Sequence, residues 1–413
     1  MRVLAFAYAC EPQEGSEPGA GWAFSRMLAS RAEVWVVTRA NNREAIEAGL
    51  ASAPERERMH FVYVDLPRWA RFWKRGRVGI QPYYLLWQLA ALREARRLHH
   101  RRAFDLVFHV TLANAWLGSF AGSIRAPFVY GPVGGTMGMP LRMAPVVGLK
   151  GVVYETVRAG VVVAARYLNP VARSAWRRAA VVLVQSSETG RWLPRRHRHK
   201  VRIFPNVALV EGVVPPAPRR VEARTALFAG NLIPLKGVAL AIDALTYLPG
   251  WTLVLCGDGR DAARLRRRAY RRGVLERVNF LGRVPRAEVI ERMHRADVFV
   301  FPSLRDSAGW AAAEAAGCGL PVVCLDRGGP PSIAGRGVPV TTAEATAREI
   351  ARRVAAASGT SAHPVFPLDL DQRARVIWKV IDDAIPRSAA ANQASGRTTA
   401  AGGAAAAHGV ATS

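Results

Sequence analysis

The residues best suited to chemistry lie in one stretch, 298–329, where two carboxylates flank a turn of small residues between apolar runs. The stretch reads VFVFPSLRDSAGWAAAEAAGCGLPVVCLDRGG and contains Asp306 and Glu314. A strand that ends at Ser303, followed by a small-residue turn and a helix over 310–317, predicts a helix N-terminus with free amide groups. Such a helix start can hold a diphosphate, and Glu314 can accept hydrogen bonds from a pair of hydroxyls. The alternative for Glu314 is a solvated charge, but its neighbours are small and apolar.

A second candidate is Lys236, in the loop FAGNLIPLKG over 228–237, which again follows an apolar run and precedes a helix. An ammonium group at that position can add its charge to the helix dipole and neutralise a phosphate. A solvated lysine is the alternative interpretation. Only five of the 58 basic residues are Lys, so a lysine in a loop after a strand favours a binding role.

Two further loops bear on the same site. GSEPGAGW, at 15–22, follows the first apolar run, and we expect a helix to begin near Trp22 after this glycine-rich loop. Glycines let a backbone approach a ligand closely, although the spacing is not that of a dinucleotide fingerprint. His109, in FHVT at 108–111, ends another apolar run. It either faces the cleft or is a core histidine whose hydrogen bonds are satisfied.

The elements that must position these residues alternate regularly along the chain. Apolar, β-rich runs occupy 2–8, 32–38, 60–66, 104–111, 126–132 and 179–186 in the first half, and 225–231, 251–259, 277–284, 296–303 and 320–326 in the second. Helix-length segments, for example 286–295, separate them. This alternation predicts βαβ units and therefore two doubly wound, parallel α/β domains. In such domains ligands bind beyond the carboxyl ends of the strands.

A chain of 413 residues is too long for a single core, which stops growing at about 250–300 residues. We predict a Rossmann-like domain over 1–204, a hinge over 205–220, a second such domain over 221–365, a helix over 366–386 able to pack back on the first domain, and a disordered Ala/Gly-rich tail over 387–413. The apolar segment 144–168 carries four charges, so we expect a buried or interfacial helix there and no membrane span.

The charge balance raises the question of partners. The formal net charge is +27, which suits nucleic acid, an anionic membrane or acidic substrates, although arginine richness alone decides little. The segment 67–77 interleaves aromatic and basic residues: Trp69, Phe72, Trp73 and Lys74. Such a mixture is typical of a lipid headgroup interface, and an ordinary solvated loop is the alternative. Nucleic acid is the least favoured partner.

Cysteine usage and the start of the chain indicate a cytoplasmic protein. The apolar run at 2–8 is too short for a signal peptide and is better explained as a first strand. The four cysteines form no CxxC pair, so we expect reduced thiols, with Cys318 and Cys324 in the core. The sequence shows no metal-ligand spacing, and we expect no metal.

Taken together, these motifs resemble the retaining glycosyltransferases of the GT4-type family, glycosyl transferases group 1, which have the GT-B fold. The family's pattern of Glu, seven residues, Glu is met by DSAGWAAAE, with Asp306 first and Glu314 second. GNLIPLKG is similar to the family's phosphate-binding loop, FPN at 204–206 to its hinge signature, and LCGDG and FLGRV to its donor-domain strands. PGAG stands where the family has its glycine loop.

The resemblance implies a role for each matching residue. Glu314 would bind the nucleotide ribose and Lys236 the diphosphate, whereas His109 would touch the sugar. Together with Asp306, which would meet the transferred sugar and phosphate, these three would be the catalytic residues. The remaining donor-binding residues would be Gly19, Asn231, Val284, Ser307, Ala308, Gly309 and Trp310. The resemblance implies no cofactor: a nucleotide-diphosphate sugar is the co-substrate, and the acceptor is an envelope polysaccharide or a lipid-linked glycan. The enzyme would work at the cytosolic face of an anionic membrane.

Two departures from the family pattern keep alternatives open. The family usually has Arg where this chain has Asn231, which removes a bidentate phosphate clamp. Asp306 is one methylene shorter than the usual Glu. A nucleotide-sugar 2-epimerase of similar architecture is one alternative. A catalytically weakened scaffold subunit is the other.

Overall fold

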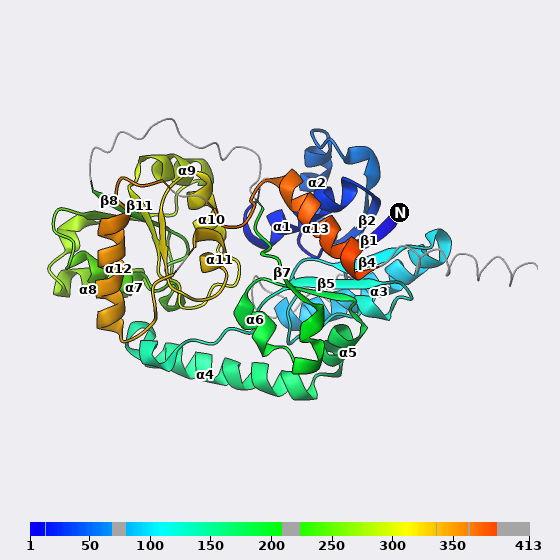
Figure 1. Ribbon diagram of the computed structural model, residues 1–413, viewed down its shortest axis with the longest axis horizontal. Helices are drawn as coiled ribbons and strands as arrows, with labels where there is room; N and C mark the ends of the chain where they lie inside the picture. Colours follow the sequence, from blue (N-terminus) through cyan, green and yellow to red (C-terminus); the bar gives the residue numbers. More distant parts are fainter. Residues whose placement is uncertain (13, 68–79, 209–223, 336, 362–363, 386–413) are drawn as a thin grey trace, which may run out of the picture.

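The computed structural model describes residues 1–12, 14–67, 80–208, 224–335, 337–361 and 364–385. These residues form two α/β lobes (Figure 1). The predicted membrane-surface residues, most of the predicted hinge and the predicted tail lie outside the described residues. Their interpretations therefore stay predictions.

The first lobe is built on a seven-stranded parallel sheet of order β3-β2-β1-β4-β5-β6-β7. Its strands are β1 (Arg2–Phe6), β2 (Glu33–Thr38), β3 (Met59–Tyr63), β4 (Leu106–His109), β5 (Phe128–Val133), β6 (Val181–Val184) and β7 (Val201–Ile203). The six strands predicted for this half are confirmed. The seventh, β7, was missed because it is short and two of its three residues are exposed.

The second lobe holds a five-stranded parallel sheet of order β10-β9-β8-β11-β12. Its strands are β8 (Thr225–Ala229), β9 (Thr252–Cys256), β10 (Val278–Gly282), β11 (Val298–Phe301) and β12 (Val322–Cys324), all within predicted runs. Cys318 and Cys324 are buried in the core of this lobe, as predicted. Because β8 pairs with β11 in parallel, the loops that follow these two strands leave the same edge of the sheet.

The first helix corrects one prediction. The helix α1 (Ser16–Ala29) begins at Ser16 rather than near Trp22, so the expected glycine loop is itself helical. A Cβ at Gly19 would lie 2.0 Å from the carbonyl oxygen of Glu14, and one at Gly21 equally close to that of Ala9. These glycines therefore let the chain between β1 and α1 pack against the helix, which outweighs their low helix propensity.

The last helix, α13 (Leu370–Ala384), packs against α1 of the first lobe. In Figure 1 it lies beside α1, within the first lobe. Its Trp378 is buried in the first lobe's core and donates from Nε1 to the carbonyl oxygen of Met27 at 3.0 Å. The C-terminal segment therefore crosses back and supports the helix that carries Gly19.

Replacing Trp378 with Ala should destabilise the first lobe by about 3–5 kcal/mol, because it opens a large cavity and leaves the Met27 carbonyl without its donor. Urea unfolding followed by circular dichroism measures this free energy. The exposed neighbour Lys379→Ala, which loses only a surface ion pair with Asp383, is the control and should change it by less than about 0.5 kcal/mol. A loss below about 1 kcal/mol for Trp378→Ala would show that α13 is not part of the cooperative core.

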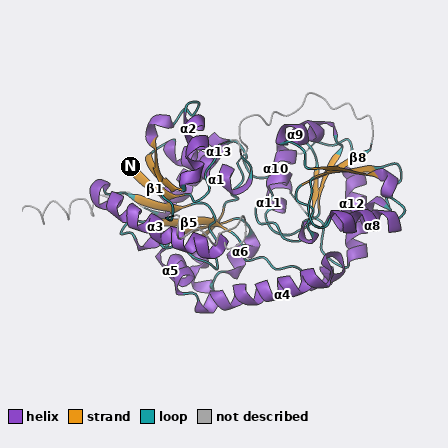
Figure 2. Cartoon of the chain, turned by 180° about the vertical axis from the view of Figure 1, so that it is seen from behind, coloured by secondary structure: helices purple, strands orange, loops and turns teal. Residues whose placement is uncertain are grey.

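The longest helix among the described residues, α4 (Ala144–Leu168), runs along one side of both lobes (Figures 1 and 2). Gly148 interrupts it with φ 73° and ψ 169°, a conformation that favours glycine. Val146 and Val147 pack in the core of the second lobe, whereas the end of α4 leads into α5 (Pro170–Arg178) of the first. The helix is thus a further contact between the lobes, beside the hinge and the segment that leads to α13. Among the described residues, no helix is long and apolar enough to cross a membrane.

Candidate functional site

Lys236 and Asp306 meet at the edge of the second sheet. Lys236 lies in the loop after β8, and Asp306 lies in the loop between β11 and α10 (Trp310–Gly317). The ammonium nitrogen of Lys236 is 2.5 Å from Oδ2 of Asp306. Lys236 also lies over the ring of Phe301, 5.0 Å from its centre. Two groups predicted from separate motifs therefore form one ion pair.

Backbone contacts fix these two loops against each other. The amide of Leu304 donates to the carbonyl oxygen of Leu235 at 2.8 Å, and the Ser303 hydroxyl donates to the same oxygen at 3.3 Å. Gly237 has φ 66°, and a Cβ there would lie 1.9 Å from the Pro302 carbonyl oxygen. The glycine that follows Lys236 is therefore required for the loops to lie this close.

The carboxylate of Asp306 also organises the turn before α10. Its Oδ1 accepts hydrogen bonds from the amides of Ala308 (3.1 Å) and Gly309 (2.8 Å). Burial raises the pKa of Asp306, but Lys236 and the two amides outweigh this effect and hold the pKa below its ordinary value. Asp306 is therefore ionised at neutral pH. In this conformation Asp306 accepts hydrogen bonds from the same amide groups that the sequence analysis predicted to bind a diphosphate.

Glu314 lies in α10 and has a cation partner that sequence reasoning missed. Its Oε1 accepts from Nε of Arg286 at 2.8 Å, and its side chain is 14% exposed against 41% for Arg286. Arg286 is the first residue of α9 (Arg286–Arg295), two positions after the half-buried Val284. No local pattern links residues 28 positions apart, so only the fold brings this arginine to Glu314. A ligand hydroxyl pair would share or displace Arg286.

The first lobe approaches the same turn. Trp310 reaches α1, where its ring carbon Cη2 lies 3.6 Å from the position that a Cβ on Gly19 would take. Ser307 contacts Met137 across the lobes, with 3.9 Å between Oγ and Sδ. The indole N–H of Trp310 is buried and has no hydrogen-bond partner among the described residues. The predicted Gly19, Ser307 and Trp310 are thus brought to one interface.

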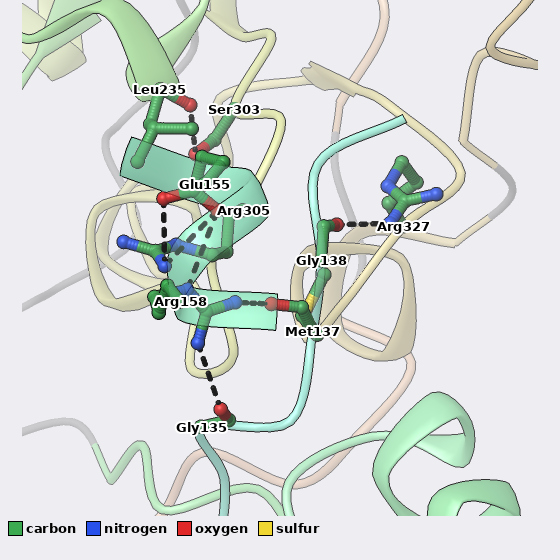
Figure 3. A network of polar contacts seen from close by, with 9 residues as sticks. All are labelled: Gly135, Met137, Gly138, Glu155, Arg158, Leu235, Ser303, Arg305 and Arg327. Carbon is green, nitrogen blue, oxygen red and sulfur yellow. Dashed lines mark hydrogen bonds and ion pairs between the residues drawn. The ribbon is translucent and has the colours of Figure 1, made fainter. Parts of the chain in front are cut away.

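A network of arginines and backbone carbonyls ties this interface together (Figure 3). Arg158 of α4 donates to the carbonyl oxygens of Gly135 (3.1 Å) and Met137. Arg305 of the second lobe pairs with the buried Glu155 at 3.0 Å. Desolvation and the nearby Arg158 lower the pKa of Arg305, although Glu155 opposes this.

Arg327 completes the network by donating to the carbonyl oxygen of Gly138 at 2.8 Å. Apart from Arg158, these cations come from loops of the second lobe, and their acceptors lie in α4 or in the loop 134–138. These contacts join the two lobes around Ser307.

His109 ends β4, as predicted, but it is buried. Its Nε2 lies 2.6 Å from the Tyr84 hydroxyl and its Nδ1 lies 2.7 Å from the Ser119 hydroxyl. Burial lowers the pKa of His109 to about 4, so the ring is neutral at neutral pH. Its contact with a sugar, implied by the family resemblance, would require one of these hydrogen bonds to open.

Glu17, in the first turn of α1, is a partly buried acid that sequence reasoning missed. Its Oε2 accepts from the amide of Leu112 at 2.8 Å and its Oε1 from the side-chain amide of Asn206 at 3.1 Å. Burial raises its pKa, and these two hydrogen bonds only partly offset that. Glu17 therefore joins the loops after β4 and β7 to α1. Asn231, by contrast, is exposed in the loop before Lys236.

The arrangement offers one fixed ammonium, one ionised carboxylate, a helix N-terminus and an inner glutamate at the ends of parallel strands. These groups suit a ligand with a negative charge and a hydroxyl pair. A cavity of about 450 Å³ reaches the turn before α10 at Ser307 and is lined by residues of α4 and both lobes that include Asn114, Trp116, Tyr154, Arg158 and Ser307. In the part of the chain that the structure describes, no cluster of His, Cys, Asp or Glu is arranged to hold a metal ion.

The fold defines the class of protein. The chain superposes on the structure of Anabaena HepE in complex with UDP, with a TM-score of 0.55 at 19% identity. The match covers 93% of this chain and 100% of the HepE chain. The sucrose-phosphate synthase of Thermosynechococcus elongatus gives 0.56 at 18% identity, covering 98% of this chain and 100% of that one. The two parallel sheets, facing each other with the site between them, are the GT-B fold.

The second lobe is similar to a known family. Residues 215–359, a part of the chain that covers most of this lobe, match the family Glycosyl transferases group 1. The D-inositol 3-phosphate glycosyltransferase of Jonesia denitrificans is 40% identical over 119 residues, which are 26% of this chain and 28% of the relative. The glycogen synthase of Mycobacterium tuberculosis is 38% identical over 107 residues, 25% of this chain and 26% of the relative. The matched region thus spans little more than a quarter of these relatives.

Proposed function

We propose that this protein is a retaining glycosyltransferase that moves a sugar from a nucleotide-diphosphate donor to an acceptor. The observation that carries the proposal is the meeting of Lys236 with Asp306 at the start of α10, inside the region that matches the glycosyl transferases group 1 family. A diphosphate leaving group gains negative charge as the bond to the sugar breaks. A preorganised ammonium and a helix N-terminus stabilise that charge.

In the proposed mechanism each residue has one task. Lys236 has three N–H donors, of which one points to Asp306, so the diphosphate can share the cation. Asp306 keeps the turn before α10 in shape through Ala308 and Gly309, and Glu314 takes the ribose. The acceptor hydroxyl attacks the anomeric carbon from the side on which the diphosphate departs, which preserves the configuration, and its proton passes to the leaving diphosphate.

We place the acceptor in the cavity beside Ser307 and propose an envelope polysaccharide or a lipid-linked glycan at the cytosolic membrane face. The strongly basic charge supports an anionic setting. A structure of similar fold is that of the lipopolysaccharide outer core galactosyltransferase WaaB, with a TM-score of 0.56 at 13% identity over 93% of this chain and 99% of that one. Contact with the membrane through Trp69, Phe72, Trp73 and Lys74 stays a prediction.

The test is a donor panel. UDP-, GDP-, ADP- and dTDP-sugars are incubated with the protein, with and without a membrane lipid extract, while nucleotide release and thermal stabilisation are followed. UDP-glucose comes first, because HepE has also been crystallised with it. We expect one donor to raise the unfolding temperature by several degrees and to release its nucleotide. Epimerised nucleotide sugar without release would favour the 2-epimerase, and no donor binding at all would favour the scaffold subunit, with Asn231 as its cause.

A further inference from the structure

The face of α4 that points away from both lobes is apolar. Eight large apolar side chains on this helix are between 50% and 81% exposed: Leu149, Val153, Tyr154, Val157, Val161, Val163, Tyr167 and Leu168. In both views α4 lies along the outside of the molecule (Figures 1 and 2). So large a group of exposed apolar residues on a single helix marks an interaction surface.

The opposite face of α4 is already occupied. Glu155 and Val162 are buried, and Arg158 points toward the loop 134–138 (Figure 3). Of the twelve exposed residues between Leu149 and Leu168, Lys150 is the only charged one. The helix therefore has one face packed on the protein and one face whose large apolar side chains are at least half exposed. A helix held in this way can lie along a partner with its exposed face.

The surroundings of this face are strongly basic. Between residues 141 and 202 the chain has thirteen Lys and Arg against two Glu, a formal net charge of +11. Arg142, Arg173, Arg195 and Arg196 are exposed near the two ends of α4 or on the segments next to it. A partner for this face must therefore offer apolar surface and negative charge together. An anionic bilayer offers both, with acyl chains beneath charged headgroups.

The same face is continuous with the proposed acceptor cavity. Tyr154, Val157 and Val161 are exposed on α4 and also line the cavity that Ser307 adjoins. A bilayer against α4 would therefore place the headgroup of a lipid-linked acceptor within reach of the donor turn. A second copy of the chain fits less well, because two such faces would bring their basic surroundings against each other.

We propose that the exposed face of α4 docks the protein on an anionic membrane, with the helix lying in the plane of the interface. Tyr154 and Tyr167 have the rings with a polar end that such an interface favours, and the surrounding arginines meet the headgroups. The inference extends the proposed function, since it supplies the surface that presents a lipid-linked acceptor. It is separable from that function, since the face does not contact Lys236, Asp306 or Glu314.

The test is vesicle flotation of the full chain with phosphatidylcholine alone and with phosphatidylcholine containing 30% phosphatidylglycerol, an anionic content set on the order of that of biological leaflets. We expect the wild type to float with the anionic vesicles and less so as salt rises. The variant Val153→Glu/Val163→Glu should reduce the bound fraction at least about tenfold, because two carboxylates would enter the apolar boundary. The matched control is Tyr270→Glu/Val365→Glu, which adds the same charge at exposed apolar positions of the second lobe.

Three results would overturn the inference. The first is a wild type that floats with neither kind of vesicle, and the second is equal flotation of the two double variants. The third is a wild-type dimer, detected by light scattering, that dissociates in Val153→Glu/Val163→Glu, because this would assign the face to a second copy of the chain. Circular dichroism and thermal unfolding establish that both variants are folded. Nucleotide release from the donor in detergent is measured in parallel. If the wild type releases nucleotide but does not float with vesicles, the docking surface alone is rejected. If it floats but releases no nucleotide, the proposed transferase activity alone is rejected.

Discussion

Replacing Lys236 with Ala is expected to lower kcat/KM for nucleotide release by about 100- to 1000-fold, the loss typical of removing one preorganised group that stabilises developing charge. Lys236 lies in the loop after β8, this loop is held against the β11 loop through Leu235, and the Lys236 side chain is 22% exposed. Such a partly desolvated cation acts more strongly than one in water. Because the charge on the diphosphate grows as the sugar leaves, most of the loss should fall on kcat rather than on KM.

Two variants separate this effect from a change of fold. Lys236→Ala leaves the mostly buried Asp306 without its cation, so the unfolding temperature must be measured for the same sample. Lys236→Arg keeps the charge at a different length and should recover part of the rate. Lys379→Ala removes an exposed lysine far from the cleft and should leave kcat/KM unchanged. A loss below about threefold in a folded Lys236→Ala protein would remove Lys236 from the diphosphate site.

The elements that carry the site were predictable because their signals are local. The run 296–303, the small-residue turn and the helix over 310–317 appear as β11, the turn held by Asp306, and α10 with Gly309 at its start. Short apolar runs separated by helix-length segments suffice to predict parallel strands. Once the strands are placed, the loops after β8 and β11 must lie at one edge, which brings Lys236 close to Asp306.

The errors and omissions concern properties that depend on distant parts of the chain. Glycines at 19 and 21 indicated a loop, yet they lie within α1, because the preceding segment packs too closely for any Cβ. His109 is at the expected strand end, but Tyr84 and Ser119, which occupy its two nitrogens, come from 25 positions before and 10 positions after it. From the sequence, His109 could either face the cleft or be a core histidine with satisfied hydrogen bonds. Only the packing distinguishes these two possibilities.

The exposure of α4 also could not be predicted from its composition. The charges Glu155 and Arg158 indicated that the segment does not cross a membrane, but both point inward and join the contacts between the lobes. Eight large apolar residues of the same helix point outward, the reverse of the usual helix in a soluble protein. Composition alone cannot reveal this inversion, since it depends on which face the second lobe and the loop 134–138 occupy.

Replacing Glu314 with Ala should raise KM for the donor by about 10- to 100-fold, which corresponds to the roughly 1.5–3 kcal/mol of hydrogen bonds to a charged group. If the carboxylate binds the two ribose hydroxyls, it does so before and during bond cleavage alike, so kcat should change less than KM. The measurement is a steady-state titration of the donor identified by the panel. It contrasts with Lys236→Ala, where kcat should carry most of the loss.

The ion pair with Arg286 makes this prediction sharper. A carboxylate that serves the ribose must give up or share Arg286, so Arg286→Ala should leave KM unchanged or lower it. If Glu314 instead only joins α9 to α10, Glu314→Ala and Arg286→Ala remove the same contact and should raise KM equally. The control is Glu288→Ala, which breaks a Glu–Arg ion pair within α9. It shows how much KM changes when such a pair is lost away from the proposed ribose site. Equal effects of Glu314→Ala and Arg286→Ala would therefore reject Glu314 as a donor ligand, even if the protein proves to be an active transferase.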